Sequence, residues 1–301
     1  MLHYHTSILL AEVIEMLRIY PGGVYVDCTF GGGGHSKELL KHLDEEGKLI
    51  VFDQDEDARR NLPEDGRVIF VPHNFRYLQR FLKLYKVSKV DGIMADLGVS
   101  SHQFDEAARG FSTRFEADLD MRMNNRQSLK AYDVVNTYSE ERLHKLFEQY
   151  GEVTNAKTLA RTIVEIRRSV SLKTTNNFKT AIGAIVKGNP SKYFAQVFQA
   201  LRIEVNDELN ALREMLQQTP ALVKPGGRIV ILTFHSLEDR IVKNFFKKGS
   251  FDEDSGNPFL QHEEKQHPFK IITKKPISPS EEEQKINPRS RSAKLRVAER
   301  N

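Results

Sequence analysis

The chain has 301 residues, with 45 lysines and arginines, 41 aspartates and glutamates, no tryptophan and one cysteine. One cysteine excludes an intramolecular disulfide framework and a cysteine-based zinc site, and it is typical of a reducing compartment. The net charge of +4 is unevenly placed: residues 1–260 hold 35 basic and 35 acidic side chains, and residues 261–301 hold 10 and 6. Within the neutral part, residues 153–192 hold eight basic side chains and one acid. Two basic regions favour a polyanionic partner, although an ordinary solvated surface would give the same counts.

The N-terminal stretch has no basic region before its apolar residues, and no window of the chain approaches 18 apolar residues. We therefore expect neither a signal peptide nor a membrane span, and we expect a cytoplasmic protein.

The first hundred residues alternate helical and strand patterns. Apolar spacing predicts helices over 8–17 and 36–43, and short apolar runs predict strands over 24–26, 49–52, 68–71 and 92–95. This alternation predicts a parallel sheet covered on both faces, and ligands of such sheets bind at the carboxyl ends of the strands. Asp27, Asp53 and Asp96 stand at three of those ends.

The strand pattern stops near residue 105. Helices are expected over 139–150, 155–170 and 176–186, followed by a long helix over 198–217 and a strand over 229–232. We therefore predict an α/β protein: a doubly wound core made of residues 1–104 and 200–301, with a helical insert over 105–199. The last forty residues contain four prolines and little periodicity, which predicts an extended tail that lies on the fold or is partly disordered.

The clearest chemical signal is a glycine loop between the first strand and the next helix. Residues 27–36 read Asp-Cys-Thr-Phe-Gly-Gly-Gly-Gly-His-Ser, and glycines let a ligand approach the backbone closely. Asp53 follows the next strand, where a carboxylate can bind a ribose diol. Ser36 stands where a dinucleotide fingerprint needs its third glycine, and no Walker A lysine follows. The pattern favours a nucleoside ligand without a pyrophosphate, such as S-adenosylmethionine. A tight turn without a ligand, with Asp27 only capping the loop, is the alternative.

Asp96 ends the fourth strand and would face such a ligand. A carboxylate at that place can hold an amine and take up positive charge as a methyl group arrives on it. The alternative is that Asp96 only orders the turn over 97–101.

The string from Phe234 to Asp239 contains a serine and a histidine, but no hydrolase elbow accompanies them. Ser236 and Asp239 fit a capping box that starts a helix over 237–246. His235 follows a strand end and could line the pocket.

The remaining histidines and the basic helix carry weaker signals. His3, His5, His35 and His73 lack the spacing of a metal site, so no metal is predicted. The predicted helix over 155–170 has a basic side with Lys157, Arg161, Arg167 and Arg168, which could contact nucleic-acid phosphates or could simply face water.

Taken together, these strings resemble those of the bacterial small-subunit ribosomal RNA cytosine-N4 methyltransferases of the MraW/RsmH type. The resemblance runs nearly end to end, and it rests on residues 5–10, 29–36, 91–93, 96–101, 109–112, 119–123, 233–240 and 287–292.

The resemblance implies S-adenosylmethionine as methyl donor and the N4 amine of a cytidine in the decoding region of 16S ribosomal RNA as acceptor. It implies a Rossmann-like methyltransferase core with a helical domain for substrate recognition. It also implies cofactor contacts by Gly33, Gly34, His35, Asp53, Phe75, Asp96 and Gln103. Asp53 would take the ribose, Phe75 would lie near the adenine, and Asp96 and Gln103 would lie near the methionine end. From its place at the strand end, we further predict Asp96 as the catalytic residue.

One departure concerns the target base. Enzymes that methylate exocyclic amines in DNA usually carry Asp/Asn/Ser-Pro-Pro-Tyr/Phe at this strand end, whereas here Gly98 and Val99 follow Asp96-Leu97. The aromatic residue that stacks on the base must come from elsewhere, and the candidates are Phe104, Phe111, Phe115 and Phe234.

The sequence leaves other functions open. An amino-methyltransferase acting on another RNA or on DNA would share these motifs, and so would a non-catalytic RNA-binding protein with a methyltransferase-like core. A nicotinamide dehydrogenase is disfavoured by the missing glycine. The oligomeric state is open, a homodimer included.

Overall fold

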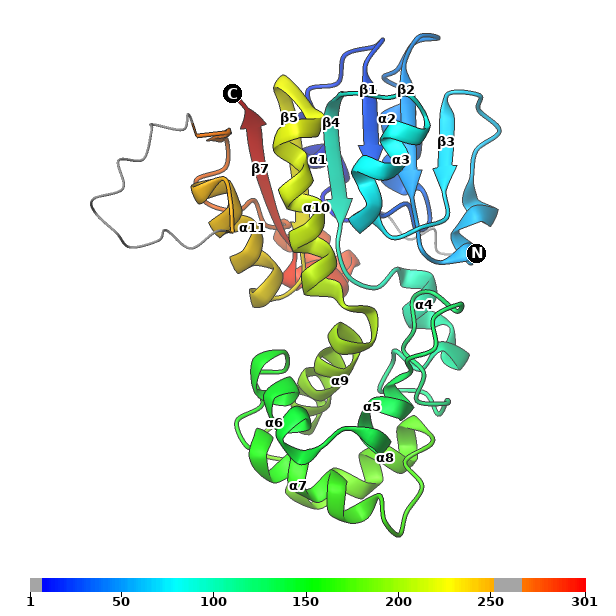
Figure 1. Cartoon of the computed structure of the whole chain (residues 1–301), viewed down its shortest axis with the longest axis vertical. Coiled ribbons are helices and arrows are strands. Elements are labelled where there is room, and N and C mark those ends of the chain that lie inside the picture. Colours follow the sequence, from blue (N-terminus) through cyan, green and yellow to red (C-terminus); the bar gives the residue numbers. More distant parts are fainter. Residues whose placement is uncertain (1–6, 252–266) are drawn as a thin grey trace, which may run out of the picture. The chain divides into compact units, whose positions relative to one another are not determined.

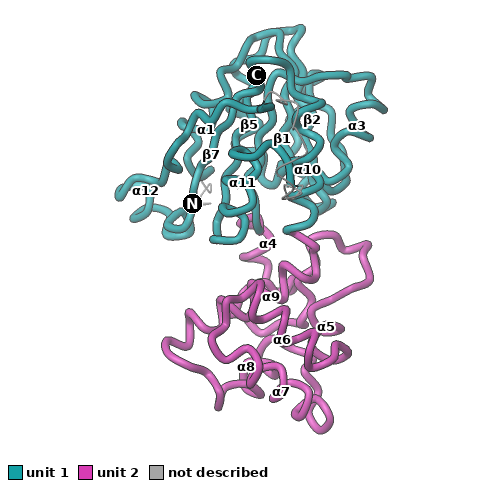
Figure 2. The backbone as a smooth tube through the Cα atoms, turned by 60° about the vertical axis from the view of Figure 1, so that its left-hand side comes forward, with its two compact units in different colours: residues 1–98, 209–301 teal, residues 99–208 magenta. Residues whose placement is uncertain are grey.

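The computed structural model describes residues 7–251 and 267–301, and the chain divides into two compact units (Figures 1 and 2). Unit 1 consists of Met1–Gly98 and Leu209–Asn301, and unit 2 of Val99–Glu208. Unit 2 is wider than the predicted insert of 105–199, because Val99 and Phe104 pack against its core and its last helix runs on to Asn206. His3 and His5 lie outside the described residues.

Unit 1 is built on a seven-stranded sheet in the order β3-β2-β1-β4-β5-β7-β6. The strands are β1 Val24–Asp27, β2 Lys48–Phe52, β3 Val68–Val71, β4 Val90–Asp96, β5 Val223–Thr233, β6 Phe269–Ile271 and β7 Lys294–Arg300. Strands β1 to β5 pair in parallel, whereas β7 pairs antiparallel with β5 and with β6. The strand order reverses between β1 and β4, and sheets of this kind bind ligands at such a switch point. The predicted doubly wound α/β fold is confirmed.

Helices cover both faces of this sheet. On one face α1 (Leu10–Leu17) and α2 (Gly34–Leu40) share an apolar cluster with alternate residues of the strands. On the other face α3 (Leu78–Leu84) packs the Phe81 ring 6.0 Å from that of Phe52. Figure 1 shows α3 and α10 (Glu208–Leu222) in front of the strands and α1 behind them. Helix α11 (Ser236–Lys248) packs beside β6, with the rings of Phe246 and Phe269 6.0 Å apart.

The sequence predicts an extended C-terminal tail that lies on the fold or is partly disordered, whereas its last residues form a strand of the sheet. After α12 (Glu281–Ile286), the chain enters the sheet as β7, and Leu295 and Val297 are fully buried. Their apolar side chains alternate in the sequence with Lys294 and Arg296, but Arg296 is buried as well. Arg296 donates to Asp239 of α11 at 2.6 Å, so this cation of the basic tail stabilises the fold.

The predicted long helix over 198–217 is also wrong. It is two helices, α9 (Pro190–Asn206) and α10, separated by Asp207 at φ 49°. Aspartate tolerates this left-handed conformation better than most residues, and one such residue ends a helix. The apolar spacing continues through the break, so the sequence pattern alone does not show it.

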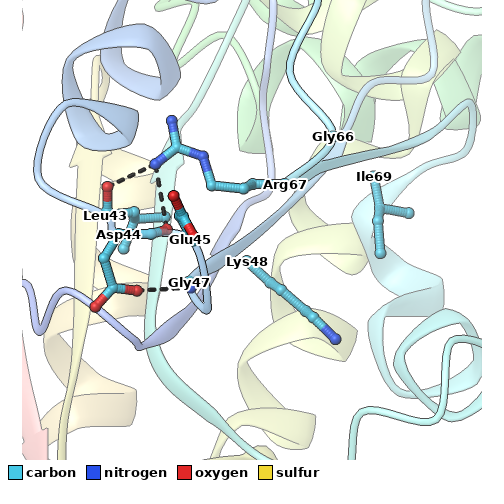
Figure 3. A pocket seen from close by; sticks show the side chains of 8 residues that line it. All are labelled: Leu43, Asp44, Glu45, Gly47, Lys48, Gly66, Arg67 and Ile69. Atoms are coloured by element: carbon cyan, nitrogen blue, oxygen red, sulfur yellow. Dashed lines mark hydrogen bonds between the residues drawn. The ribbon is translucent and has the colours of Figure 1, made fainter.

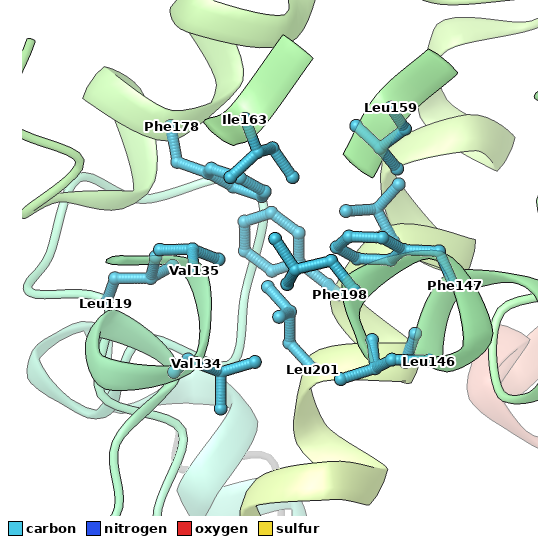
Figure 4. Close-up of a cluster of buried hydrophobic side chains, with 14 of the residues drawn as sticks. Leu119, Val134, Val135, Leu146, Phe147, Leu159, Ile163, Phe178, Phe198 and Leu201 are labelled. Atoms are coloured by element: carbon cyan, nitrogen blue, oxygen red, sulfur yellow. The ribbon is translucent and has the colours of Figure 1, made fainter. Parts of the chain in front are cut away.

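Unit 2 is helical and has its own core (Figure 4). Its helices are α4 (Ser101–Asp105), α5 (Ala131–Thr137), α6 (Glu140–Gln149), α7 (Ala156–Ile166), α8 (Thr175–Ile182) and α9. The core includes Phe147, Ile163, Phe178, Val197 and Leu201, all without solvent exposure. In the described part of the chain, none of the helices has both the length and the apolar character that crossing a membrane requires.

Candidate active site

The glycine loop joins β1 to α2, and packing requires glycine at two of its positions. Gly33 has φ 76°, and a Cβ there would lie 2.8 Å from the Phe30 ring. A Cβ on Gly34 would collide with the Ser7 hydroxyl. A Cβ on Gly32 would meet nothing within 4 Å, so this part of the loop presents bare backbone to the space around it. Bare backbone is what lets a ligand approach the main chain closely.

Asp27 holds the loop in place from inside. One of its carboxylate oxygens accepts from the Thr29 amide at 2.9 Å and the other from the Ser36 hydroxyl at 2.6 Å. Burial raises the pKa of Asp27, and the hydrogen bonds from Ser36 and Thr29 oppose that shift. The structure therefore shows Asp27 capping the glycine loop, which is the alternative role that the sequence left open for it.

Asp53 follows β2 and faces the same loop. Its Oδ2 accepts from the Gly31 amide and its Oδ1 from the Asp55 amide, each at 2.8 Å. A carboxylate oxygen has two lone pairs, so each retains one for a further donor such as a ribose hydroxyl. Burial raises the pKa of Asp53 to about 6.

Phe75 lies in the short turn after β3. The neighbouring Asn74 donates from its side-chain amide to Gln54 at 3.0 Å, which ties this turn to the residue after Asp53. The ring of Phe75 is half-buried. The structure thus brings the predicted adenine and ribose residues to neighbouring strand ends.

Asp96 ends β4, beside β1. Its amide donates to the Thr29 hydroxyl at 2.6 Å, which joins the two strand ends at the switch point. Its Oδ2 lies 3.7 Å from His35 Nδ1, and its Oδ1 is buried without a hydrogen-bond partner among the described residues. Burial raises the pKa of Asp96 to about 6, and the His35 ring partly offsets this.

His35 connects three parts of the site. Its ring is buried, Nε2 lies 3.0 Å from the Ile8 carbonyl oxygen, and Nδ1 faces Asp96. His35 therefore joins the loop, the segment before α1 and the end of β4. This fixes the Asp96 carboxylate at the edge of the sheet.

The electrostatics of this region, which we call the carboxyl edge (Asp27, Asp53, Asp96 and the glycine loop), favour a cationic ligand. Burial dominates the raised pKa of both Asp53 and Asp96, and the charge of Asp27 raises each further. Buried carboxylates with too few cations stabilise a positive group beside them. S-adenosylmethionine carries a sulfonium and an ammonium, so the residues present fit it, whereas a pyrophosphate would be repelled.

Gln103 belongs to unit 2, where it caps α4. Its amide donates to Ser100 Oγ at 3.2 Å, and its side-chain oxygen accepts from the Ser100 amide at 3.1 Å. Ser100 therefore orders the turn after β4, a role that the sequence offered to Asp96 as an alternative. A cofactor contact by Gln103 stays a prediction.

The four aromatic candidates differ in their surroundings. In unit 2, Phe111 is buried in the core, Phe104 packs against that core, and Phe115 is 42% exposed. In unit 1, the Phe234 ring lies next to Gly98, 3.8 Å from where a Cβ would stand. Phe234 is therefore the candidate that lies beside the end of β4.

The predicted capping box at Ser236 is wrong. Helix α11 begins at Ser236 itself, with His235 as the capping residue and without a side-chain capping bond from it. Glu238, and not Asp239, reaches back, and its carboxylate accepts from the Phe234 amide at 2.8 Å. Asp239 instead receives the hydrogen bond from Arg296.

A hollow of about 730 Å³ lies at the opposite end of the same strands (Figure 3). It is lined by residues at the starts of β2 and β3, and its arginine is already engaged: Arg67 donates to Asp65 and to the Leu43 carbonyl oxygen. The carboxyl edge lies at the other end of these strands, where Asp27, Asp53 and Asp96 stand.

A parallel sheet with a glycine loop after β1, an acid after β2 and an acid after β4 defines a Rossmann-like methyltransferase core. The sequence profile of the MraW methylase family matches residues 2–301. The chain therefore belongs to the MraW methylase family, and the predicted cofactor, S-adenosylmethionine, agrees with this membership.

Curated relatives span the whole chain. The ribosomal RNA small subunit methyltransferase H of Bacteroides thetaiotaomicron is 51% identical over 99% of this chain and 98% of its own. The protein of the same name from Phocaeicola vulgatus is 52% identical over 99% of this chain and 97% of its own. Among solved structures, a putative methyltransferase from Streptococcus mutans in complex with SAH aligns over 97% of this chain and 95% of its own, with 13% identity and a TM-score of 0.39.

Proposed function

We propose that this chain transfers the methyl group of S-adenosylmethionine to the N4 amine of one cytidine in the decoding region of 16S ribosomal RNA. The observation that carries the proposal is the Asp96 carboxylate, fixed at the end of β4 with one buried oxygen that lacks a hydrogen-bond partner among the described residues. The names of the relatives, which describe methyltransferases of small-subunit ribosomal RNA, support the substrate.

Methyl transfer to an exocyclic amine depends more on hydrogen-bond acceptors around the nitrogen than on a strong base. The lone pair of an exocyclic amine is delocalised into the base ring, so the nitrogen becomes nucleophilic only as its hydrogens are held and its positive charge is stabilised. The Asp96 carboxylate can accept one amine hydrogen and stabilise that charge. S-adenosylmethionine, when bound, supplies an activated methyl group, and the protein contributes position and electrostatics.

The remaining residues of the site have binding roles. Asp53 would accept the ribose hydroxyls with its two remaining lone pairs, and Phe75 would pack on the adenine. Gly33, Gly34 and His35 would shape the wall of the site. Gln103 would contact the methionine end of the cofactor.

Unit 2 supplies exposed cations that suit an RNA backbone. We call Lys157, Arg168, Lys173, Lys187 and Lys192 the unit-2 cations, because all five are exposed. The three other basic residues of this region have partners within the chain. Arg161 donates to Glu165 at 2.8 Å, Arg167 to the Val135 and Tyr138 carbonyl oxygens, and Lys179 to that of Thr113. We assign unit 2 to substrate recognition, with phosphate contacts by the unit-2 cations. A ribosomal substrate places the protein in the cytoplasm, and a homodimer stays a prediction.

A substrate panel tests this function. Purified protein and radiolabelled S-adenosylmethionine are incubated with small ribosomal subunits that lack the modification, with naked 16S ribosomal RNA, and with duplex DNA. We expect label in the ribosomal RNA of the subunits and none in DNA. Label in DNA would favour the DNA amino-methyltransferase, and failure to bind the cofactor would favour the non-catalytic RNA-binding protein.

A further inference from the structure

His235 is a buried histidine that the fold leaves unsatisfied. Its side chain is 8% exposed, and neither ring nitrogen has a hydrogen-bond partner among the described residues. Buried polar groups in native proteins are nearly always hydrogen-bonded, and leaving one unpaired is costly. A histidine kept only for packing would not need this arrangement.

The backbone brings His235 to the strand end next to Asp96. Strands β4 and β5 are parallel neighbours, and Asp96 pairs with Leu232, three residues before His235. The Leu97 amide donates to the Leu232 carbonyl oxygen at 3.1 Å, and the Phe234 ring lies beside Gly98. His235 and Asp96 therefore leave the sheet at the same edge, on adjacent strands.

Glu238 contacts His235 directly and acts on Asp96 through its charge alone. Its Oε1 lies 3.2 Å from His235 Nε2, while its Oε2 accepts from the Phe234 amide and so fixes the carboxylate. After burial and the charge of Asp27, the charge of Glu238 also raises the pKa of Asp96. His235, Glu238 and Asp96 thus form one electrostatic cluster in unit 1.

The position of Glu238 determines what the imidazole can do. A neutral histidine carries its proton on one nitrogen and accepts through the other. The Glu238 carboxylate makes no hydrogen bond to Nε2, but its negative charge 3.2 Å away favours the proton on that nitrogen. Nδ1 is then an acceptor, and its lone pair is left for a ligand.

We propose that His235 Nδ1 is the second acceptor for the target amine and takes the proton that the amine loses. This inference rests on the proposed function. An N4 amine has two hydrogens, and Asp96 and His235 would each hold one. A uridine presents a carbonyl oxygen at that place, so the same two acceptors would repel it.

In the transfer step, the amine nitrogen forms a bond to the methyl carbon while the carbon–sulfur bond breaks, and that bonding pair stays on sulfur. The nitrogen, now positively charged, releases one proton to His235 Nδ1. The resulting imidazolium is stabilised by Glu238 and returns the proton to water after the product leaves. General bases of this kind contribute about 10²–10⁴-fold to a rate.

Two substitutions at one position test this role. His235→Phe keeps the ring volume and removes both nitrogens, whereas His235→Asn keeps an acceptor near the place of Nδ1. With small subunits as substrate, we expect His235→Phe to lower kcat at least 100-fold and His235→Asn to lower it clearly less. Affinity for S-adenosylmethionine, measured by calorimetry, should stay within threefold for both. His42→Ala is the control, because His42 is exposed and lies just beyond the end of α2, and its kcat should stay within twofold.

The outcomes separate this inference from the proposed function. If the unaltered protein methylates no cytosine amine in small subunits, the proposed function is wrong. If it does, and His235→Phe turns over at a near-normal rate, only the role of His235 is wrong. An equal loss of kcat in both variants, or a loss of cofactor affinity that accounts for the lower turnover, would also contradict the role.

Discussion

The carboxyl edge of unit 1 is negatively charged and largely buried, whereas the unit-2 cations are positively charged and exposed. The acids of the edge are few: hydrogen bonds hold the carboxylates of Asp27 and Asp53, that of Asp96 lies beside His35, and burial raises the pKa of each. The unit-2 cations are several, exposed and carried by different helices and loops. The charge of a buried group is little weakened by water, so a single group can have a large electrostatic effect. The charge of an exposed cation is weakened by water and salt, so several cations are needed for a comparable effect. We therefore assign the chemistry to unit 1 and substrate affinity to unit 2.

The largest expected effect is at Asp96. Asp96→Ala should lower kcat at least 10²–10³-fold, because it removes a preorganised acceptor from the place where positive charge develops. The fold should stay intact, since the Asp96 amide and not its carboxylate bonds to Thr29. Single-turnover kinetics with excess enzyme measures the loss, and Asp57→Ala, another acid substitution in unit 1, is the control. A variant that keeps near-normal turnover would contradict the role of Asp96.

Asp53 should affect binding more than chemistry. Asp53→Ala removes the carboxylate that we propose to bind the ribose, and it leaves the Gly31 amide without its acceptor. At about 1.5–3 kcal/mol for a hydrogen bond to a charged group, the Kd for S-adenosylmethionine should rise about 10- to 100-fold. Calorimetry tests this, and a Kd unchanged within twofold would show that the ribose binds elsewhere.

The raised pKa of Asp96 predicts a pH profile. A protonated carboxyl loses the negative charge that the reaction uses, so kcat/KM should fall about tenfold for each pH unit below about 6. Bound cofactor carries positive charge and should move the corresponding step in kcat to lower pH. Rates from pH 4.5 to 8.5 measure both, and a profile flat through pH 5 would mean that Asp96 is not needed as the anion.

The raised pKa of Asp96 also affects the stability of the fold. The ionised carboxylate that favours activity lowers the free energy of unfolding. An acid whose pKa is raised by folding binds its proton more tightly in the folded state, so its ionised form destabilises the fold above the folded pKa. Asp96→Asn should therefore raise Tm at pH 8, by an amount that corresponds to about 1–2 kcal/mol, and by about half as much at pH 5, which lies midway between the ordinary pKa of 3.8 and the folded value of about 6. Thermal unfolding at the two pH values checks this. A lower Tm at pH 8 would show that the charge stabilises the fold.

Single changes among the unit-2 cations should have the smallest effects. Lys173→Gln or Lys187→Gln should raise KM by threefold or less, with kcat unchanged, because each removes one of the phosphate contacts that we propose. Combining substitutions should reduce the salt dependence of RNA binding by about one charge for each cation that is replaced. Binding titrations at several salt concentrations measure this slope. If the variant with all five unit-2 cations replaced shows the same salt-dependence slope as the unaltered protein, RNA binds to another surface.

Much of the fold could be predicted because short apolar runs determine the parallel strands. Their ends then place Asp27, Asp53 and Asp96 at one edge. Strand β7 was missed because its apolar residues alternate with cations that look solvent-facing. The partner of Arg296 is Asp239, 57 residues earlier in the chain, and no local pattern shows that pairing.

Contacts between residues far apart in the sequence were also missed in the site. The residue types at the strand ends indicated a nucleoside ligand without a pyrophosphate, but the specific contacts are set by tertiary packing. That His35 reaches Asp96, and that Gly31 donates to Asp53, depends on how β1, β2 and β4 lie side by side. The same is true of Glu238, whose contact with His235 replaces the capping box expected at Ser236.

The most direct test of the central claim is nucleoside mass spectrometry of 16S ribosomal RNA. Small subunits lacking the modification are incubated with S-adenosylmethionine and either the unaltered protein or Asp96→Asn, and the RNA is digested and mapped. Our account predicts N4-methylcytidine at one position of the decoding region with the unaltered protein and a loss of at least 100-fold with the variant. Methylation of a carbon or of another base, or equal product from both proteins, would contradict it.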